Sequence, residues 1–217
     1  MYAVALLILL GAANPDGWQL IFEKDGFKAF ERAGTPPSYR AEATVKMDLA
    51  ELAAVFTDIP RQKEWVSHLA ESWIVAGDPL DTHVVYSRFT LPWPMKDRDT
   101  VVQRVVTRLP QEGKVVIRFH QTYHPTIPAR SDCIRVPLTE GEFSMAEVSR
   151  GSVHLTYTVR LDPGGRLPSW LVRTFVRDAP YQTLRAFQFQ VERTRGQYDT
   201  FVARERAKWE REKASTH

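Results

Sequence analysis

Cysteine and clustered histidine are scarce in this sequence. Its 217 residues include one cysteine, Cys133, and six histidines that are scattered along the chain. One cysteine cannot form an intramolecular disulfide, and the familiar multi-cysteine zinc sites need several thiolate ligands at close spacing. We therefore expect no disulfide, no metal and no other cofactor.

Catalytic signature motifs are missing as well. The chain has no GxSxG elbow, phosphate-binding glycine loop, dinucleotide fingerprint or HExxH pair. Two weaker candidates are the group His120, Tyr123 and His124, which could act in acid–base chemistry, and the carboxylate pair Asp97 and Asp99. Loop-exposed histidines and strand-start caps are the commoner explanations of such residues, so we expect no catalytic residue.

Charge of one sign is not in large excess, but it is unevenly distributed. The formal net charge is +3, and residues 168–217 carry 10 basic and 6 acidic side chains while residues 1–167 carry 19 and 20. A basic C-terminal surface could attract anionic head groups, or it could be an ordinary solvated helix face. No basic stripe interleaved with aromatic residues indicates nucleic acid, and we expect no such partner.

The N-terminal apolar run is too short to span a bilayer. Residues 3–13 (AVALLILLGAA) number eleven, whereas a transmembrane helix needs roughly 20. The length fits a signal-peptide core, with the small residues Gly11 and Ala13 before a candidate cleavage site, although no charged segment precedes it. We interpret residues 1–13 as a truncated signal peptide and expect a periplasmic or secreted protein; a buried N-terminal strand or helix is the alternative.

Period-two alternation dominates from Trp18 to Asp162 and predicts an antiparallel sheet. The alternation is clearest in the segment 152–162, where apolar residues on one face predict a strand with one buried side. Asp48 is predicted to cap a helix that runs through Thr57. A second helical turn over residues 65–69 is expected after Pro60. The remaining strands are predicted at residues 27–32, 39–47, 72–76, 83–90, 99–109, 114–123, 130–136 and 141–148.

After the turn DPGG at residues 162–165 the apolar period changes to 3.6, which is typical of a helix. Pro168 lies at the predicted helix start, and Pro180 is expected to kink the helix. One face of this helix carries Val172, Val176, Ala179, Thr183, Phe187 and Val191. The sequence therefore predicts an α+β fold in which a curved sheet closes around one apolar helix and encloses an apolar cavity.

Three strings resemble the StAR-related lipid transfer (START) domain in its bacterial form, a member of the SRPBCC/Bet v 1-like superfamily. They are DLAELAAVFTDIPRQKEWVSHLAES, YSRFTLPWPMKDRDTVVQR and LDPGGRLPSWLVRTFVRDAPYQTLRAF. The resemblance covers residues 18–195 and leaves residues 196–217 as a C-terminal helical extension. It implies a helix-grip fold, with a curved antiparallel β-sheet wrapped around a long kinked C-terminal α-helix and an internal apolar cavity for one lipid.

The resemblance also implies a set of ligand-binding residues. Arg104 matches the arginine that projects into the family's cavity, although an outward-facing arginine is the alternative because both faces of its strand are apolar. Some members pair this arginine with a carboxylate on the preceding strand; the ungapped match here is Val85, so we expect that pair to be lost. The residues expected to contact lipid are Arg104, Val85, Val102, Phe119, His120, Tyr123, Ile127, Val176, Thr183, Phe187 and Val191.

The segment YHPTIP at residues 123–128 resembles a loop beside the cavity mouth. Its tip at Ile127 could dip into a bilayer, or it could form a rigid proline turn. The leading hypothesis is a monomeric, non-enzymatic carrier that takes one phospholipid, sterol-like or fatty-acyl lipid and touches membranes transiently. The alternative is a polyketide cyclase or aromatase that uses the same cavity. An enzyme of that kind should line its pocket with several titratable groups, and a carrier should not.

Overall fold

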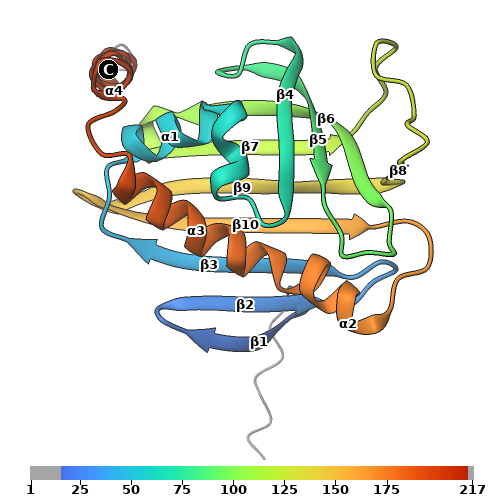
Figure 1. Cartoon of the computed structure of the whole chain (residues 1–217). Coiled ribbons are helices and arrows are strands. Elements are labelled where there is room, and N and C mark those ends of the chain that lie inside the picture. Colours follow the sequence, from blue (N-terminus) through green and yellow to red (C-terminus); the bar gives the residue numbers. More distant parts are fainter. Residues whose placement is uncertain (1–15, 215–217) are drawn as a thin grey trace, which may run out of the picture.

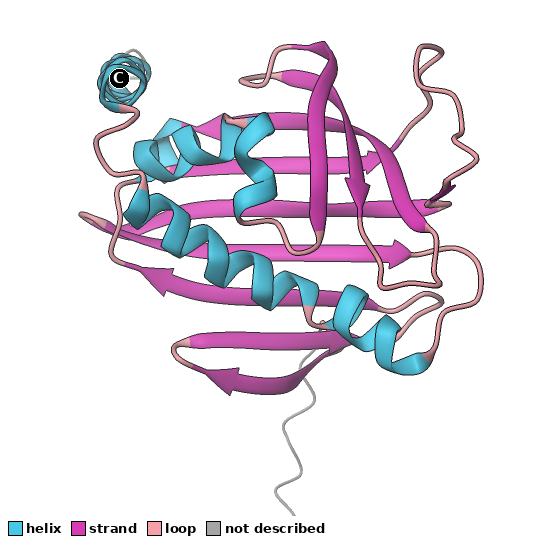
Figure 2. Cartoon of the chain, viewed as in Figure 1, coloured by secondary structure: helices cyan, strands magenta, loops and turns pink. Residues whose placement is uncertain are grey.

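A long, strongly curved sheet is the framework of the protein (Figures 1 and 2). The computed structural model describes residues 16–214. Its sheet has 10 strands in the order β1-β2-β3-β10-β9-β7-β6-β5-β4, and β8 pairs in parallel with β6 off this path. The strands are β1 (Trp18–Lys24), β2 (Phe27–Arg32), β3 (Ser38–Val45), β4 (Leu69–Gly77), β5 (Thr82–Phe89), β6 (Asp97–Leu109), β7 (Lys114–Gln121), β8 (Cys133–Arg135), β9 (Leu138–Ser149) and β10 (Ser152–Asp162).

Strand β10 lies between the N-terminal strands β1 to β3 and the strands β4 to β9 in the sheet. It pairs with β3 on one side and with β9 on the other, antiparallel to both. Its predicted bounds are confirmed, and Val153, Leu155 and Val159 are buried on the concave face. Tyr157 shares that face but is only partly buried, because one side of its ring borders free space while the other packs against Phe143.

The described residues also form seven helical elements. They are α1 (Leu49–Thr57), the short 3₁₀ helices η1 (Ile59–Glu64) and η2 (Pro110–Glu112), α2 (Ser169–Val172), the π-helical segment η3 (Arg173–Arg177), α3 (Ala179–Arg193) and α4 (Asp199–Ala214). The Asp48 cap is confirmed, since its carboxylate accepts hydrogen bonds from the amides of Ala50 (2.8 Å) and Glu51 (3.3 Å). The turn predicted over residues 65–69 is wrong in position: η1 precedes it, and Leu69 already begins β4.

The long C-terminal helix crosses the sheet diagonally over β3 and β10 (Figure 1). It is bent where the sequence predicts a kink: η3 interrupts the α-helical hydrogen bonds, and α3 restarts with Pro180 in its first turn. Proline is tolerated there because the first-turn amides have no intrahelical acceptor. The bend places α2 and η3 over the end of the sheet where β10 ends and β6 begins.

Helix α4 is separate from α3. Gly196 adopts a left-handed backbone with φ +84° between the two helices. Two ion pairs attach α4 to the rest of the protein, Arg206 to Asp48 (3.0 Å) and Arg108 to Glu205 (3.3 Å). Within residues 16–214 no helix is both long and apolar enough to cross a membrane. The predicted signal peptide lies outside the described residues.

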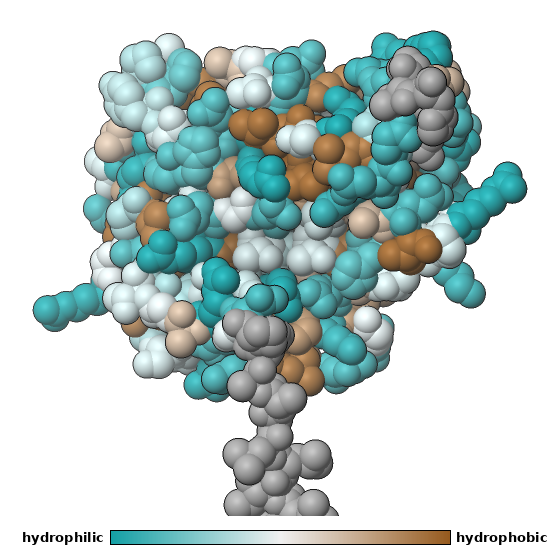
Figure 3. Space-filling model, turned by 180° about the vertical axis from the view of Figure 1, so that it is seen from behind, coloured by the Kyte–Doolittle hydropathy of each residue, from teal (hydrophilic) through white to brown (hydrophobic). Residues whose placement is uncertain are grey.

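An aromatic core fills one end of the space between helices and sheet. The ring centroids of Phe56 and Phe143 are 4.9 Å apart, those of Trp65 and Phe187 4.7 Å, and those of Phe143 and Phe187 5.3 Å. The convex side is different: seen from behind, most of the surface is polar, and apolar residues gather in the upper half of the view (Figure 3). The concave side away from the aromatic core is not filled by side chains, and this is where the cavity lies.

Candidate functional site

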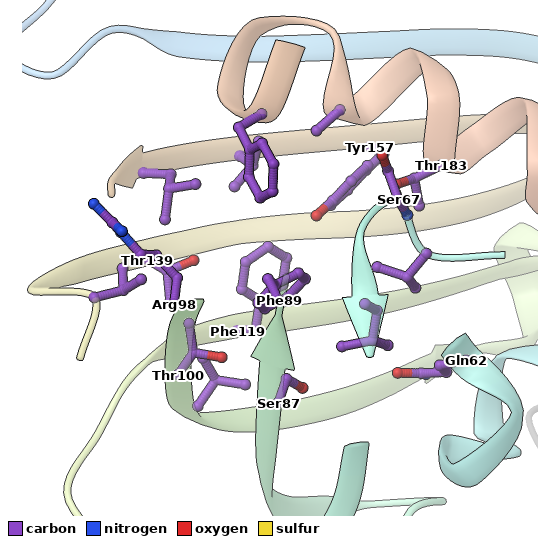
Figure 4. Close-up of a pocket in the computed structure, with 18 of the residues that line it drawn as sticks. Gln62, Ser67, Ser87, Phe89, Arg98, Thr100, Phe119, Thr139, Tyr157 and Thr183 are labelled. Atoms are coloured by element: carbon purple, nitrogen blue, oxygen red, sulfur yellow. The ribbon is translucent and has the colours of Figure 1, made fainter. Parts of the chain in front are cut away.

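An internal cavity of about 140 Å³ lies between the sheet and the bent C-terminal helix. Its wall is mostly apolar, with side chains from η1, β4 to β7, β9, β10, η3 and α3. The polar side chains of the wall are Gln62, Ser67, Ser87, Arg98, Thr100, Arg104, Thr139, Tyr157 and Thr183. Figure 4 shows Gln62 and Arg98 at opposite ends, with Tyr157 and Phe119 between them. An elongated apolar space with polar groups at its ends suits an amphiphile.

Arg104 forms the charged part of the inner end. It shares the concave face of β6 with Val102, and its Nη1 donates a hydrogen bond to Oε1 of Gln62 at 3.1 Å. The amide of Gln62 is itself fixed, because its Nε2 donates to the backbone oxygen of Phe56 at 2.8 Å. Burial lowers the pKa of Arg104 to about 10, which leaves the guanidinium charged at neutral pH. The cavity therefore contains a cation held by a neutral amide.

The residue opposite Arg104 on β5 is His83, whereas Val85 pairs with Val102. His83 is only 2% exposed, and burial, together with the charge of Arg104, lowers its pKa to about 4. It is therefore neutral at pH 7. Among residues 16–214 Arg104 has no ion pair.

The middle of the cavity carries hydroxyl groups. The Tyr157 side chain points into the space (Figure 4), and burial raises its pKa to about 12, so the phenol is neutral. Thr183 accepts a hydrogen bond from the amide of Ser67 at 3.3 Å, and the Ser67 hydroxyl donates to Oε1 of Gln182 at 2.7 Å. These bonds fix the segment between η1 and β4 against α3. The middle of the wall thus offers neutral donors and acceptors and no charge.

Arg98 closes the other end. Its guanidinium donates to the backbone oxygens of Pro163 (2.9 Å), Lys96 (2.6 Å) and Gly164 (2.9 Å), and the side chain is buried. These carbonyls belong to the β5–β6 and β10–α2 connections, so one arginine ties the two loops together over the cavity. Because three of its five N–H donors bond to carbonyls of these two loops, Arg98 acts as a structural clamp.

The candidate acidic and histidine groups have structural roles. Asp99 is fully buried and accepts two hydrogen bonds from Arg135 (2.9 and 3.0 Å), which attaches β8 to β6. Asp97 accepts from the amide of Leu91 at 3.2 Å. His124 bonds to Thr126 in an exposed loop. No carboxylate or histidine lines the cavity in the part of the chain that the structure describes, and no cluster there could hold a metal ion.

The structure brings part of the predicted ligand set together. Arg104, Val102, Phe119, Val176 and Thr183 line the cavity.

The other predicted contacts lie elsewhere. Val85 packs with Ile59 and Val102 and does not line the cavity. Phe187 and Val191 belong to the main core. His120 is on an exposed position of β7, Tyr123 is 77% exposed, and Ile127 shares its loop. Periodicity identifies the inward face of an element, but it does not show how far along that face the space extends.

Several residues of the site and its rim were not predicted. Tyr157 had a signal, since it lies on the buried face of the alternation in β10. Gln62 and Ser67 lie in short irregular segments where no period operates. Two tryptophans are also exposed at the end closed by Arg98: Trp93 of the β5–β6 connection is 92% exposed, and Trp170 of α2 is 58% exposed.

Comparisons with known proteins agree with this geometry. A family model described as START domain matches residues 3–191. An uncharacterized protein of Pseudomonas aeruginosa is 32% identical over 195 residues, which span 88% of this chain and 95% of that protein. The phosphatidylcholine transfer protein of Bos taurus is 29% identical over 171 residues, 76% of this chain and 77% of that protein. The crystal structure of the STAR-related lipid transfer protein of Xanthomonas axonopodis has a TM-score of 0.72 at 25% identity, covering 82% of this chain and 99% of that chain.

Proposed function

Because the chain belongs to the START domain family, we propose that it binds a single hydrophobic lipid in its cavity and carries it between membranes. The observation that supports this proposal is the mostly apolar cavity between the sheet and the bent helix. The names of the bovine and Xanthomonas relatives, which are lipid transfer proteins, point the same way.

The chemistry of the wall supports a carrier over a cyclase. A cyclase needs a general acid or base within reach of its substrate. The titratable side chains of the wall are two arginines and Tyr157, and burial raises the pKa of that phenol to about 12. Neither Arg104, whose pKa burial lowers to about 10, nor Tyr157 titrates near neutral pH. We therefore propose that the protein is not an enzyme.

The exposed tryptophans support a membrane-docking surface at the Arg98 end. Tryptophan favours the bilayer interface because its ring is apolar and its indole N–H is polar. Trp93 and Trp170 are exposed there, and the exposed cations Lys96, Arg166 and Arg173 lie close to them in the sequence. Anionic lipid would attract these cations while the two rings enter the interface.

Transfer of a fluorescent phospholipid from donor to acceptor vesicles tests the carrier. Trp93→Asp should slow transfer severalfold while leaving the circular dichroism spectrum unchanged. Ile127→Asp is the matched control, because it places the same charge on a neighbouring loop at a residue that is only partly exposed, whereas Trp93 is 92% exposed. Slowing by Ile127→Asp alone would assign docking to residues 122–132 instead. Absence of transfer by the wild type would reject the carrier.

Export and a monomeric state are further parts of the proposal. Export rests on the apolar run at residues 3–13. Fractionation of cells that express the full chain would test export, and size-exclusion chromatography with light scattering would test the monomer.

A further inference from the structure

We propose that the cavity admits one acyl chain and that Phe119 is the residue that excludes a second. This inference rests on the proposed function and deepens it, since it names a class of ligand, the single-chain lipid, and a residue that determines specificity. Lipids with two acyl chains are then disfavoured, whatever head group they carry.

The cavity is small for a lipid. Its volume of about 140 Å³ is below the roughly 300–1,000 Å³ of common ligand pockets and close to the roughly 150 Å³ of an engineered cavity that holds benzene. An acyl chain longer than this space enters by displacing the walls. Overfilling a packed interior is costly because its side chains must leave their preferred rotamers. The cost rises with each chain that is added, so one chain is favoured over two.

A ridge of aromatic rings crosses the floor of the cavity. It consists of Phe119 on β7, Tyr157 on β10 and Phe143 on β9, which all line the space. The ring centroids of Phe119 and Tyr157 are 6.2 Å apart, and those of Tyr157 and Phe143 are 5.6 Å apart. Rings at these spacings are in contact, so no chain passes between them. A ligand that extends between the ends marked by Gln62 and Arg98 therefore crosses the aromatic ridge on its helix side (Figure 4).

Phe119 is the member of the aromatic ridge that lies over a glycine. It pairs with Gly141 across the β7–β9 ladder, and a Cβ at Gly141 would lie 2.6 Å from Cζ of Phe119. The ring therefore occupies the room that a side chain at position 141 would otherwise take. Phe143 instead packs against Phe187 in the main core, with ring centroids 5.3 Å apart. Truncation of Phe119 leaves a hollow that opens onto the cavity, because glycine has no side chain to fill it.

The other walls beside the aromatic ridge are fastened by hydrogen bonds. Ser67 joins the segment before β4 to α3, since its amide donates to Thr183 at 3.3 Å and its hydroxyl donates to Gln182 at 2.7 Å. Arg98 joins two loops through three backbone oxygens. Widening the cavity on either side breaks such bonds, and a buried donor or acceptor left without a partner is costly. The ring of Phe119 has no hydrogen bond to lose, so its size determines how many chains enter.

Two water-soluble probes test this specificity: dodecanoyl-lysophosphatidylcholine and dihexanoylphosphatidylcholine. They share the head group and the number of acyl carbons, which form one long chain in the first probe and two short chains in the second. Binding to the delipidated full chain is measured by isothermal titration calorimetry, below the concentrations at which either probe forms micelles. We expect the wild type to bind the single-chain probe about tenfold or more tightly, within the range that overfilling a core costs.

Two variants locate the effect. Phe119→Ala should reduce this preference to within about threefold, because the hollow over Gly141 accepts the second chain. Phe189→Ala is the matched control, since it removes the same ring from an exposed position that does not line the cavity, and it should keep the wild-type preference. If Phe119→Ala does not fold, Phe119→Leu removes less of the side chain and should give an intermediate preference.

Equal or tighter binding of the two-chain probe by the wild type would overturn this inference while leaving lipid carriage intact. A wild-type preference that persists unchanged in both Phe119 variants would overturn the role of Phe119. Failure of the wild type to bind either probe, together with the absence of any bound lipid after incubation with vesicles of mixed single-chain and two-chain lipids, would instead reject the proposed function.

Discussion

Replacing Arg104 by methionine should stabilise the ligand-free protein. Burial lowers the pKa of Arg104 from 12.5 to about 10, which corresponds to about 3 kcal/mol of free energy against the charged form. The variant loses the hydrogen bond to Gln62 and the contact with the Phe56 ring, together about 1–2 kcal/mol. The net expectation is a gain of about 1–2 kcal/mol in the free energy of unfolding.

The pH dependence has a definite sign. The pKa of Arg104 in the folded protein is below its unfolded value. The free-energy cost of burying its charge is therefore fully present below about pH 10 and decreases as the pH rises toward 12.5. The stability difference between variant and wild type should therefore be constant from pH 6 to pH 9.

Urea and thermal unfolding of the delipidated proteins measure this effect. We expect the midpoint temperature to rise by roughly 2–8 °C. Arg108→Met is the matched control on the same strand, because Arg108 pairs with Glu205 at 3.3 Å; it should destabilise. If Arg104→Met also destabilised the ligand-free protein by about 1 kcal/mol or more, the charge of Arg104 would be compensated within the protein. That result would contradict the prediction.

Three further substitutions test other parts of the structure. Glu64→Gln should lower the free energy of unfolding by about 1 kcal/mol at pH 7. The hydrogen bond from Arg61 lowers the pKa of Glu64 to about 2. In urea titrations the stability difference between variant and wild type should therefore shrink as the pH falls from about 4.5 toward 2. Asp99→Asn should cost about 3 kcal/mol by weakening a buried ion pair, and hydrogen exchange should show faster opening of β8. Gly141→Ala should cost about 1–3 kcal/mol, because its Cβ would lie 2.1 Å from the backbone oxygen of Thr158; unchanged thermal stability would contradict this.

Sequence patterns predicted the sheet and the kinked helix because each depends on local periodicity, whereas the inward orientation of Arg104 was implied by the family resemblance, since both faces of its strand are apolar. The alternation in β6 places Val102 and Arg104 on the same face, and the structure confirms that this face lines the cavity. The partner of Arg104 could not be predicted in this way. A shift of two residues in the pairing of β5 with β6 leaves every side chain on the same face but gives it a different neighbour. His83 rather than Val85 therefore lies opposite Arg104, and the β5–β6 connection determines this register.

The extent of the cavity along α3 could not be predicted from the sequence either. Phe187 lies on the same apolar stripe as Thr183, but it packs against Trp65 and Phe143 while Thr183 lines the cavity. This difference arises from tertiary packing of aromatic rings from four separate elements, which no single segment encodes. Exposure of Trp93 likewise follows from the path of its loop.

Native mass spectrometry tests the central claim most directly. The full chain is incubated with vesicles, separated from them and sprayed under non-denaturing conditions, beside a Val176→Trp variant whose larger side chain would fill part of the cavity. We predict one lipid per wild-type chain, and little or none in the variant. Wild-type protein without bound lipid, or equal loading of the variant, would contradict a lipid site in this cavity.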